Sequence, residues 1–166
     1  MRHLKALALS LIFLSLIILA FAALIPSKVK VSRALSINAN QATVRGCISD
    51  TNSWQLWFPY FKNTPKNNIY LTNSEQKLSD GKYTLGLVSS TDSILQLQFI
   101  TSKSGASIVF YYNIINQQQG CVVNCYTYKI SSWLPWQKFR NLIADNVLGS
   151  SIDSNLAALK NYAEKQ

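Results

Sequence analysis

Acidic side chains and histidine are scarce in this chain of 166 residues. It holds seven Asp and Glu residues against 16 Lys and Arg, and its single histidine, His3, precedes a long apolar run. General acid–base catalysis and metal binding both draw on these side chains. No cluster of them and none on an apolar face is visible, so the sequence predicts no catalytic group, no metal site and no cofactor, and it leans against an enzyme.

Cysteines are few and odd in number. Cys121 and Cys125 lie four residues apart in a predicted strand, which places them on one face about 13 Å apart and too far apart for a disulfide with each other. With Cys47 as the third, at least one thiol has no partner within the chain. We expect buried thiols that act as small apolar side chains.

The net charge of +9 results from the scarcity of acidic residues. The basic residues are scattered, and no run of even three Lys or Arg occurs. Nucleic-acid binding usually needs a basic stripe or cluster, so no nucleic-acid partner is predicted. Lys28, Lys30 and Arg33 follow the apolar run. They suit anionic lipid headgroups, at roughly 1 kcal/mol each, and the alternative is a solvated positive surface.

A long uncharged segment, ALALSLIFLSLIILAFAALI at residues 6–25, carries only two serines. About 20 such residues span a bilayer core of roughly 30 Å. We therefore predict an amino-terminal transmembrane anchor over residues 1–27 and the lipid bilayer as a partner. The alternative is a cleaved signal peptide, since Ala20-Phe21-Ala22 resembles a cleavage site.

The membrane side of the rest of the chain is weakly determined. Arg2 and Lys5 lie on one side of the apolar segment and Lys28, Lys30 and Arg33 on the other, so the positive-inside rule gives almost no preference for either orientation. A short amino-terminal tail usually stays inside, which predicts an extracytoplasmic domain. The sequence gives no indication of the oligomeric state.

Residues 28–166 are predicted to form one domain. Residues 29–37 alternate as a strand, residues 41–49 follow as a short helix capped by Asn40, and Trp54 to Phe58 form a helical turn that Pro59 ends. These short helices with their aromatic residues are expected to close one end of a curved sheet. The remaining strands, at 68–72, 82–90, 93–101, 106–115 and 121–130, form an antiparallel meander.

A long amphipathic helix is predicted from Pro135 to the end, with a bend at Gly149. The chain thus runs strand, two short helices, antiparallel strands and long helix. This order predicts an α+β fold in which the last helix lies on the concave side of the sheet.

The order also resembles a known family. Residues 30–59 and the last helix are similar to the START/Bet v 1-like (SRPBCC) superfamily, and in particular to its small membrane-anchored polyketide cyclase/dehydrase-like or lipid-transport-like proteins. The resemblance rests on Arg33, Ile37, Ala39, Val44, Ile48, Asp50, Trp54, Trp57 and Pro59. It implies a helix-grip fold of five to seven strands. Residues 62–81 depart from the family pattern because they lack its glycine- and tryptophan-containing strand.

The resemblance further implies a membrane-tethered domain that binds a hydrophobic or amphipathic small molecule between the sheet and the last helix. A cyclase- or hydrolase-like enzyme and a non-binding scaffold with a filled interior are the alternatives. Arg33 would either bind a ligand carboxylate or phosphate, or reach water or pair with an acid of the last helix. The predicted pocket residues are Arg33, Leu35, Trp57, Leu97, Phe99, Phe110, Tyr112, Phe139, Ile143 and Val147.

Overall fold

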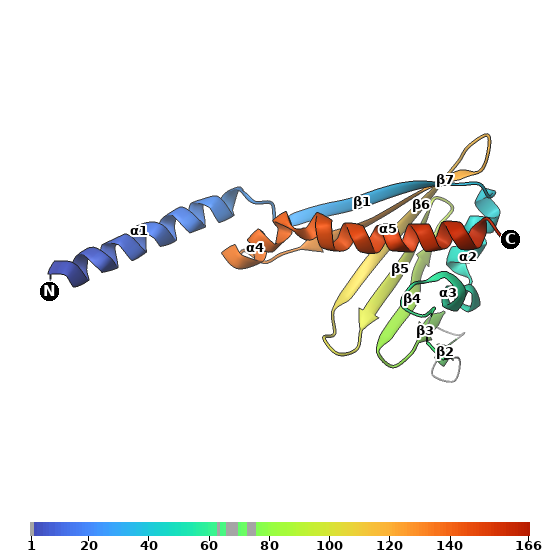
Figure 1. The fold of residues 1–166 in the computed structure, drawn as a ribbon, viewed down its shortest axis with the longest axis horizontal. Helices are drawn as coiled ribbons and strands as arrows, with labels where there is room; N and C mark the ends of the chain where they lie inside the picture. Colours follow the sequence, from blue (N-terminus) through green and yellow to red (C-terminus); the bar gives the residue numbers. More distant parts are fainter. Residues whose placement is uncertain (1, 63, 66–69, 73–75) are drawn as a thin grey trace.

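The protein consists of an extended amino-terminal helix and a domain in which a long helix lies across a curved sheet (Figure 1). The computed structural model describes residues 2–62, 64–65, 70–72 and 76–166. The first helix is α1 (Arg2–Leu24), and the chain ends in α4 (Pro135–Leu142) and α5 (Ala144–Ala163). The predicted α+β helix-grip fold is confirmed.

Among the described residues the sheet has seven strands, all paired antiparallel, in the order β1-β7-β6-β5-β4-β3-β2. The first and last strands pair along their whole length, from Lys28 opposite Ile130 to Ile37 opposite Cys121. This pairing places the start of the domain beside α4, which follows β7. The strands are β1 (Lys28–Ile37), β2 (Tyr70–Thr72), β3 (Lys77–Ser79), β4 (Tyr83–Ser90), β5 (Ile94–Thr101), β6 (Ser107–Asn116) and β7 (Cys121–Ile130).

The two faces of the sheet follow the alternation of the sequence. In β7, Cys121, Val123, Cys125 and Thr127 are buried, while the residues between them are partly exposed. On the outer face the rings of Tyr111 and Tyr126 stack at 5.0 Å. Lys30 Nζ lies 4.1 Å from the Tyr126 ring centroid, so aromatic and basic side chains cover this face instead of a second layer.

Two short helices connect β1 to the rest of the sheet. They are α2 (Gln41–Ser49) and α3 (Thr51–Trp57). The Asn40 side chain caps α2 by accepting a hydrogen bond from the Thr43 N–H. Pro59 disfavours a helical Phe58, which is extended at φ −71° and ψ 121° and ends α3. The predicted cap at Asn40, the short helix after it and the end of α3 before Pro59 are therefore all confirmed.

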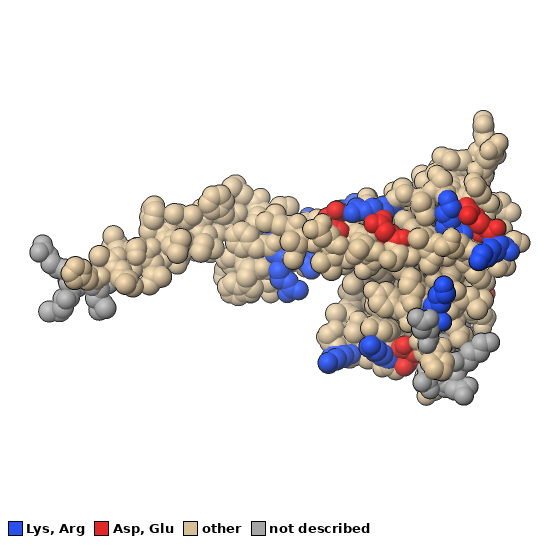
Figure 2. Space-filling model, in the orientation of Figure 1, with Lys and Arg blue, Asp and Glu red and all other residues tan. Residues whose placement is uncertain are grey.

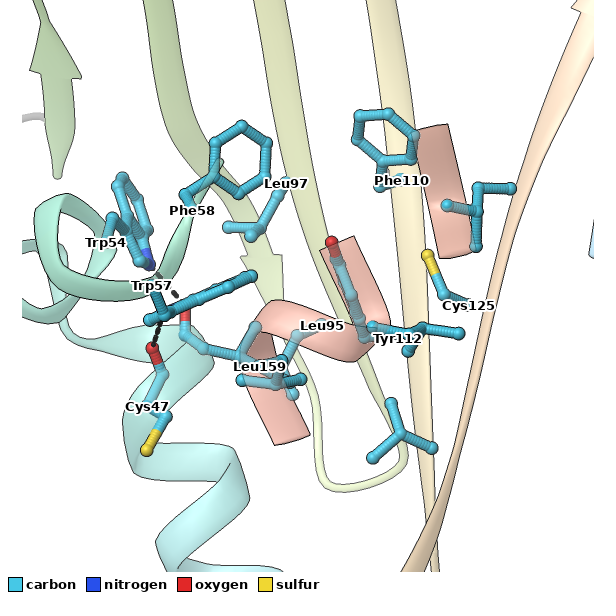
Figure 3. Packing of buried hydrophobic residues seen from close by; sticks show 14 of the residues in the cluster. Cys47, Trp54, Trp57, Phe58, Leu95, Leu97, Phe110, Tyr112, Cys125 and Leu159 are labelled. Atoms are coloured by element: carbon cyan, nitrogen blue, oxygen red, sulfur yellow. Dashed lines mark hydrogen bonds between the residues drawn. The ribbon is translucent and has the colours of Figure 1, made fainter. Parts of the chain in front are cut away.

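The tryptophans of α3 fill the end of the sheet and also complete α2 (Figure 3). The indole N–H of Trp54 donates to the Ile48 carbonyl at 2.7 Å, and that of Trp57 donates to the Cys47 carbonyl at 2.9 Å. The last carbonyls of a helix have no partner within it. The Trp54 indole supplies a donor to the Ile48 carbonyl, and the Cys47 carbonyl accepts from both the Trp57 indole and the Ser53 hydroxyl, the latter at 2.6 Å. Both rings are at most 1% exposed.

Two details differ from the sequence-based prediction. The last helix is interrupted at Ile143, where φ is −100° and ψ is 3°, and not at Gly149, which lies buried inside α5. Strand β3 was not predicted, because a three-residue strand with the single buried Leu78 gives almost no periodic signal. The predicted strand 68–72 falls partly outside the described residues, and β2 covers its end.

Helix α1 is long and apolar enough to cross a membrane, with a 20-residue segment from Lys5 to Leu24 of mean hydropathy 2.8. A signal sequence near an amino terminus has the same properties. Of the α1 residues whose side chains are described, Ala22 alone is buried, at 3% exposure. The apolar surface of this helix is therefore uncovered by the domain except at its last turn.

Candidate ligand site between the sheet and the last helix

Three polar side chains from three elements meet in the apolar core between the sheet and α5. Tyr112 of β6 and Cys125 of β7 are directly opposite each other in the sheet, and Asn155 faces them from the buried stripe of α5. All three residues are 0% exposed. Figure 3 shows Tyr112 projecting from its strand toward α5, with Leu95, Leu97 and Leu159 around it.

Several polar atoms of this group make no hydrogen bond of good geometry among the described residues, although the three side chains lie close enough to affect one another electrostatically. They are the Tyr112 hydroxyl and both side-chain polar atoms of Asn155, Oδ1 and Nδ2. A buried polar group left unpaired costs about 1–3 kcal/mol, and most such groups in folded proteins are satisfied. We call Tyr112, Cys125 and Asn155 the polar floor, and its unsatisfied donors and acceptors belong to Tyr112 and Asn155.

The polar floor is uncharged at neutral pH. Burial raises the pKa of Tyr112 well above its usual value, the adjacent Cys125 raises it further, and the Asn155 amide lowers it. Burial likewise raises the pKa of Cys125 to about 12, although the Tyr112 hydroxyl lowers it. A neutral phenol and a neutral thiol are a poor base and a poor nucleophile. The arrangement is suited to hydrogen bonding with a neutral ligand atom.

The predicted pocket residues divide into a buried group and an exposed group. Most of those on the sheet and α3 are packed core: Trp57, Leu97, Phe110 and Tyr112 are at most 2% exposed and Phe99 is 6% exposed, while Leu35 is partly buried. Those on the last two helices are open: Phe139 is 38%, Ile143 55% and Val147 60% exposed. Side chains therefore fill the space near α3 and leave apolar surface near α4.

Arg33 forms ion pairs with the last helix. Its Nη1 and Nη2 donate to the two carboxylate oxygens of Asp145 at 3.0 and 2.9 Å, and its Nε lies 3.5 Å from Asp153 Oδ2. The hydrogen bond with Asp145 raises the pKa of Arg33, and the same bond lowers the pKa of Asp145. Of the two roles considered for this arginine, the structure shows pairing with acids of the last helix.

Gly149 leaves room for the Arg33 guanidinium beside α5. A β-carbon at position 149 would collide with the Arg33 guanidinium, so a residue without a side chain lets the arginine lie flat on α5. This contact, and not a bend, is the structural role of the glycine that the sequence singled out.

Of the exposed apolar residues, Val147 lies on the other side of α5 from Arg33. Successive helical residues are about 100° apart, so Val147 projects about 200° from Gly149 and away from β1; the strands farther across the sheet from β1 are β6, β5 and β4. Figure 2 shows an indentation of the surface on that side, between α4 and the ends of these strands. We call Phe139, Ile143 and Val147 the open flank.

No family model and no curated protein matches the sequence. Solved structures, in contrast, match it at low identity. A START superfamily protein from Mycobacterium smegmatis has a TM-score of 0.54 and 11% identity, over 82% of this chain and 97% of that one. Ara h 8.0201 has a TM-score of 0.53 and 7% identity, over 84% and 99%. The chain has the START/Bet v 1-like fold.

The START/Bet v 1-like fold is shared with a larger protein as well. DynU16, from the dynemicin biosynthetic locus, has a TM-score of 0.55 and 10% identity over 81% of this chain, which spans 47% of the length of DynU16. Identities of this size establish the START/Bet v 1-like fold and leave the ligand to be argued from the residues themselves.

Sequence reasoning found Tyr112 and missed the rest of the polar floor. Asn155 lies within the apolar stripe of the last helix, between Ile152 and Leu156, and an asparagine at such a position is the signal that would have identified it. Cys125 was expected to be buried, but its register opposite Tyr112 could be known only from the pairing of β6 with β7.

We expect all three cysteines to resist alkylation in the folded protein. Cys47, Cys121 and Cys125 are at most 7% exposed, and burial raises the pKa of each, so little thiolate is available to react. Mass spectrometry after iodoacetamide treatment should find modification only in urea, while Ser104→Cys in the exposed β5–β6 turn reacts at once. Rapid modification of native Cys125 would contradict the buried position of the polar floor.

Proposed function

We propose that the protein is a membrane-tethered binding domain for a hydrophobic or amphipathic, lipid-like small molecule held between the sheet and the last helix. The observation that carries the proposal is the polar floor, a set of unsatisfied donors and acceptors in an apolar core. Ligand sites of this kind combine an apolar wall with a few convergent polar groups. A hydroxyl, carbonyl or carboxylic acid of the ligand would complete their hydrogen bonds.

The open flank supports the same proposal. Exposed large apolar side chains are costly in water unless they meet a partner, and Ile143 and Val147 are more than half exposed. An acyl chain running from this flank toward Asn155 would cover them. Because side chains fill the space above Tyr112, the ligand must move α5 away from the sheet to reach it, which makes binding coupled to a conformational change.

The tether in this proposal is α1, retained as a membrane span. A short amino-terminal tail that remains inside would place the domain outside the cytoplasm. The neutral state of Tyr112 and Cys125 supports binding in preference to catalysis.

Photolabelling tests the proposal on the full chain in lipid nanodiscs. The probe is a long-chain fatty acid that carries a diazirine, and mass spectrometry locates the modified peptides. We expect modification of α1 by bilayer-dissolved probe, which serves as an internal standard, and additional modification of β6, β7 and α5 next to the polar floor. Modification confined to α1 would overturn the binding proposal.

Two substitutions sharpen this experiment. Tyr112→Phe removes one hydroxyl, and loss of a hydrogen bond worth about 1.4 kcal/mol would lower core modification about tenfold. Asn146→Leu on the exposed side of α5 is the control, and it should leave core modification unchanged. Equal modification of the Tyr112→Phe protein and the native protein would show that the polar floor does not contribute to ligand binding.

A filled interior favours a second candidate, a scaffold domain that binds no small molecule. Trp54, Trp57, Phe58 and Phe61 are at most 1% exposed, and Phe58 also packs at 5.8 Å against Phe99. Under this alternative the polar floor is a structural cost and the photoprobe modifies only α1.

A further inference from the structure

Helix α4 packs against the last turn of α1. It covers Ala22, the one buried residue among those of α1 whose side chains are described. Asn141 of α4 donates through Nδ2 to the Pro26 carbonyl at 2.9 Å, and the Ser131 N–H donates to the Ser27 carbonyl at 2.8 Å. The corner formed by the end of β7 and α4 is therefore fixed at the level where α1 ends (Figure 1).

This corner exposes large apolar side chains. Ile130 is 76%, Trp133 75%, Trp136 63% and Leu142 66% exposed, and together we call them the juxtamembrane patch. The other two tryptophans of the chain, Trp54 and Trp57, are 0% and 1% exposed. The exposed tryptophans are thus found only at this corner, although single apolar side chains such as Tyr70 (67%) and Leu56 (56%) are exposed elsewhere in the domain.

The charged residues of this corner are basic, and the first acid that follows it, Asp145 at the start of α5, is paired with Arg33. Lys129, Lys138 and Arg140 belong to the same corner, and no acidic residue occurs in residues 1–49 or 93–144. Figure 2 shows blue basic side chains at this end of the domain, with red acidic atoms near them where α5 begins. Trp is enriched where a membrane meets water, because its ring is apolar and its N–H is polar, and basic side chains there attract anionic headgroups.

We propose that the juxtamembrane patch lies in the interfacial layer of the membrane from which α1 emerges, with Lys129, Lys138 and Arg140 at anionic phospholipid headgroups. The inference rests on the proposed tether, because α1 sets the depth: its apolar residues span the hydrocarbon core, and α4 sits beside its final turn. The partner is a phospholipid surface that contains anionic lipid. The domain consequently has one fixed orientation on the membrane, with the open flank next to the bilayer.

Tryptophan quenching by brominated lipid tests this inference. The full chain is reconstituted in vesicles of phosphatidylcholine and phosphatidylglycerol, with bromine atoms placed on the acyl chains close to the headgroups. Trp133 and Trp136 should be quenched, while Trp54 and Trp57 stay shielded inside the domain. In the Trp133→Phe/Trp136→Phe protein most of the quenching should disappear; undiminished quenching in that variant, or no quenching in the native chain, would overturn the inference.

A second pair of variants tests the headgroup contact. Lys138→Gln/Arg140→Gln should quench less than the native chain in these vesicles and about equally in phosphatidylcholine alone. Lys62→Gln/Lys103→Gln changes two basic residues away from the corner and should behave as the native chain does. If both pairs respond alike, the corner has no preference for anionic lipid and that part of the inference is wrong.

Alkaline washing of the vesicles tests the membrane tether separately from the interfacial position of the corner. A chain that stays in the vesicles but shows no quenching retains its tether and refutes the interfacial corner. A chain that washes off refutes the tether and the corner together. Neither result changes the photolabelling of the polar floor, so the binding proposal stands or falls separately.

Discussion

Trp54→Ala is expected to lower the free energy of unfolding by about 3–5 kcal/mol, the range for removal of a buried large aromatic side chain. The ring is 0% exposed, and its indole N–H donates to the Ile48 carbonyl at 2.7 Å. The substitution therefore leaves a cavity and also an unpaired carbonyl at the end of α2. Urea unfolding of the full chain in nanodiscs, followed by far-ultraviolet circular dichroism, measures the change.

The chain supplies its own control for this result. Trp133→Ala and Trp136→Ala remove the same side chain where it is more than half exposed, and surface substitutions usually change stability by at most about 0.5 kcal/mol. A loss for these variants as large as that for Trp54→Ala would show that the segment from Trp133 through α4 contributes as much to the core as α3 does.

Asn155→Leu should change stability in the opposite direction, raising the free energy of unfolding by roughly 1–3 kcal/mol. Its amide atoms have no partner among the described residues, and replacing an unsatisfied buried polar group by an apolar one of similar size removes its desolvation cost. The same variant should lose the photolabelling of the core, because it removes part of the polar floor. Stability and binding are thus expected to change in opposite senses.

Asn146→Leu is the matched control, since it makes the same substitution on the exposed side of α5. It should leave both stability and photolabelling nearly unchanged. Destabilisation by Asn155→Leu would mean that the amide is already satisfied in the ligand-free protein, for example by a buried water. The polar floor would then no longer support the proposed function.

The sequence predicted the architecture well because the elements of this domain carry strong local signals. The alternation of apolar and polar residues predicted the bounds of β1 and β7 to within one residue. Asn40 marked the start of α2, and Pro59 marked the end of α3. The interruption at Ile143 left no such mark. Neither Pro nor Gly stands there, and the chain bends where α4 turns to pack on α1, which is a tertiary contact.

The site was less predictable than the fold for a physical reason. The pattern of apolar residues identifies which side chains face the interior, and Tyr112 and Trp57, which it selected, are both buried. It gives no account of how tightly they pack, so it could not separate the filled end near α3 from the open flank near α4. That difference depends on the distance between α5 and each strand, which only the assembled structure contains.

The connection between α1 and β1 is three residues long, from Ile25 to Ser27, which is about 10 Å at full extension. Pro26 stiffens it, and hydrogen bonds from Asn141 and Ser131 hold its carbonyls in place. If α1 spans a membrane as proposed, a domain joined so closely to it would stay at the surface of that membrane. Any lipid that it binds would then be exchanged with the adjacent leaflet and not with a facing bilayer.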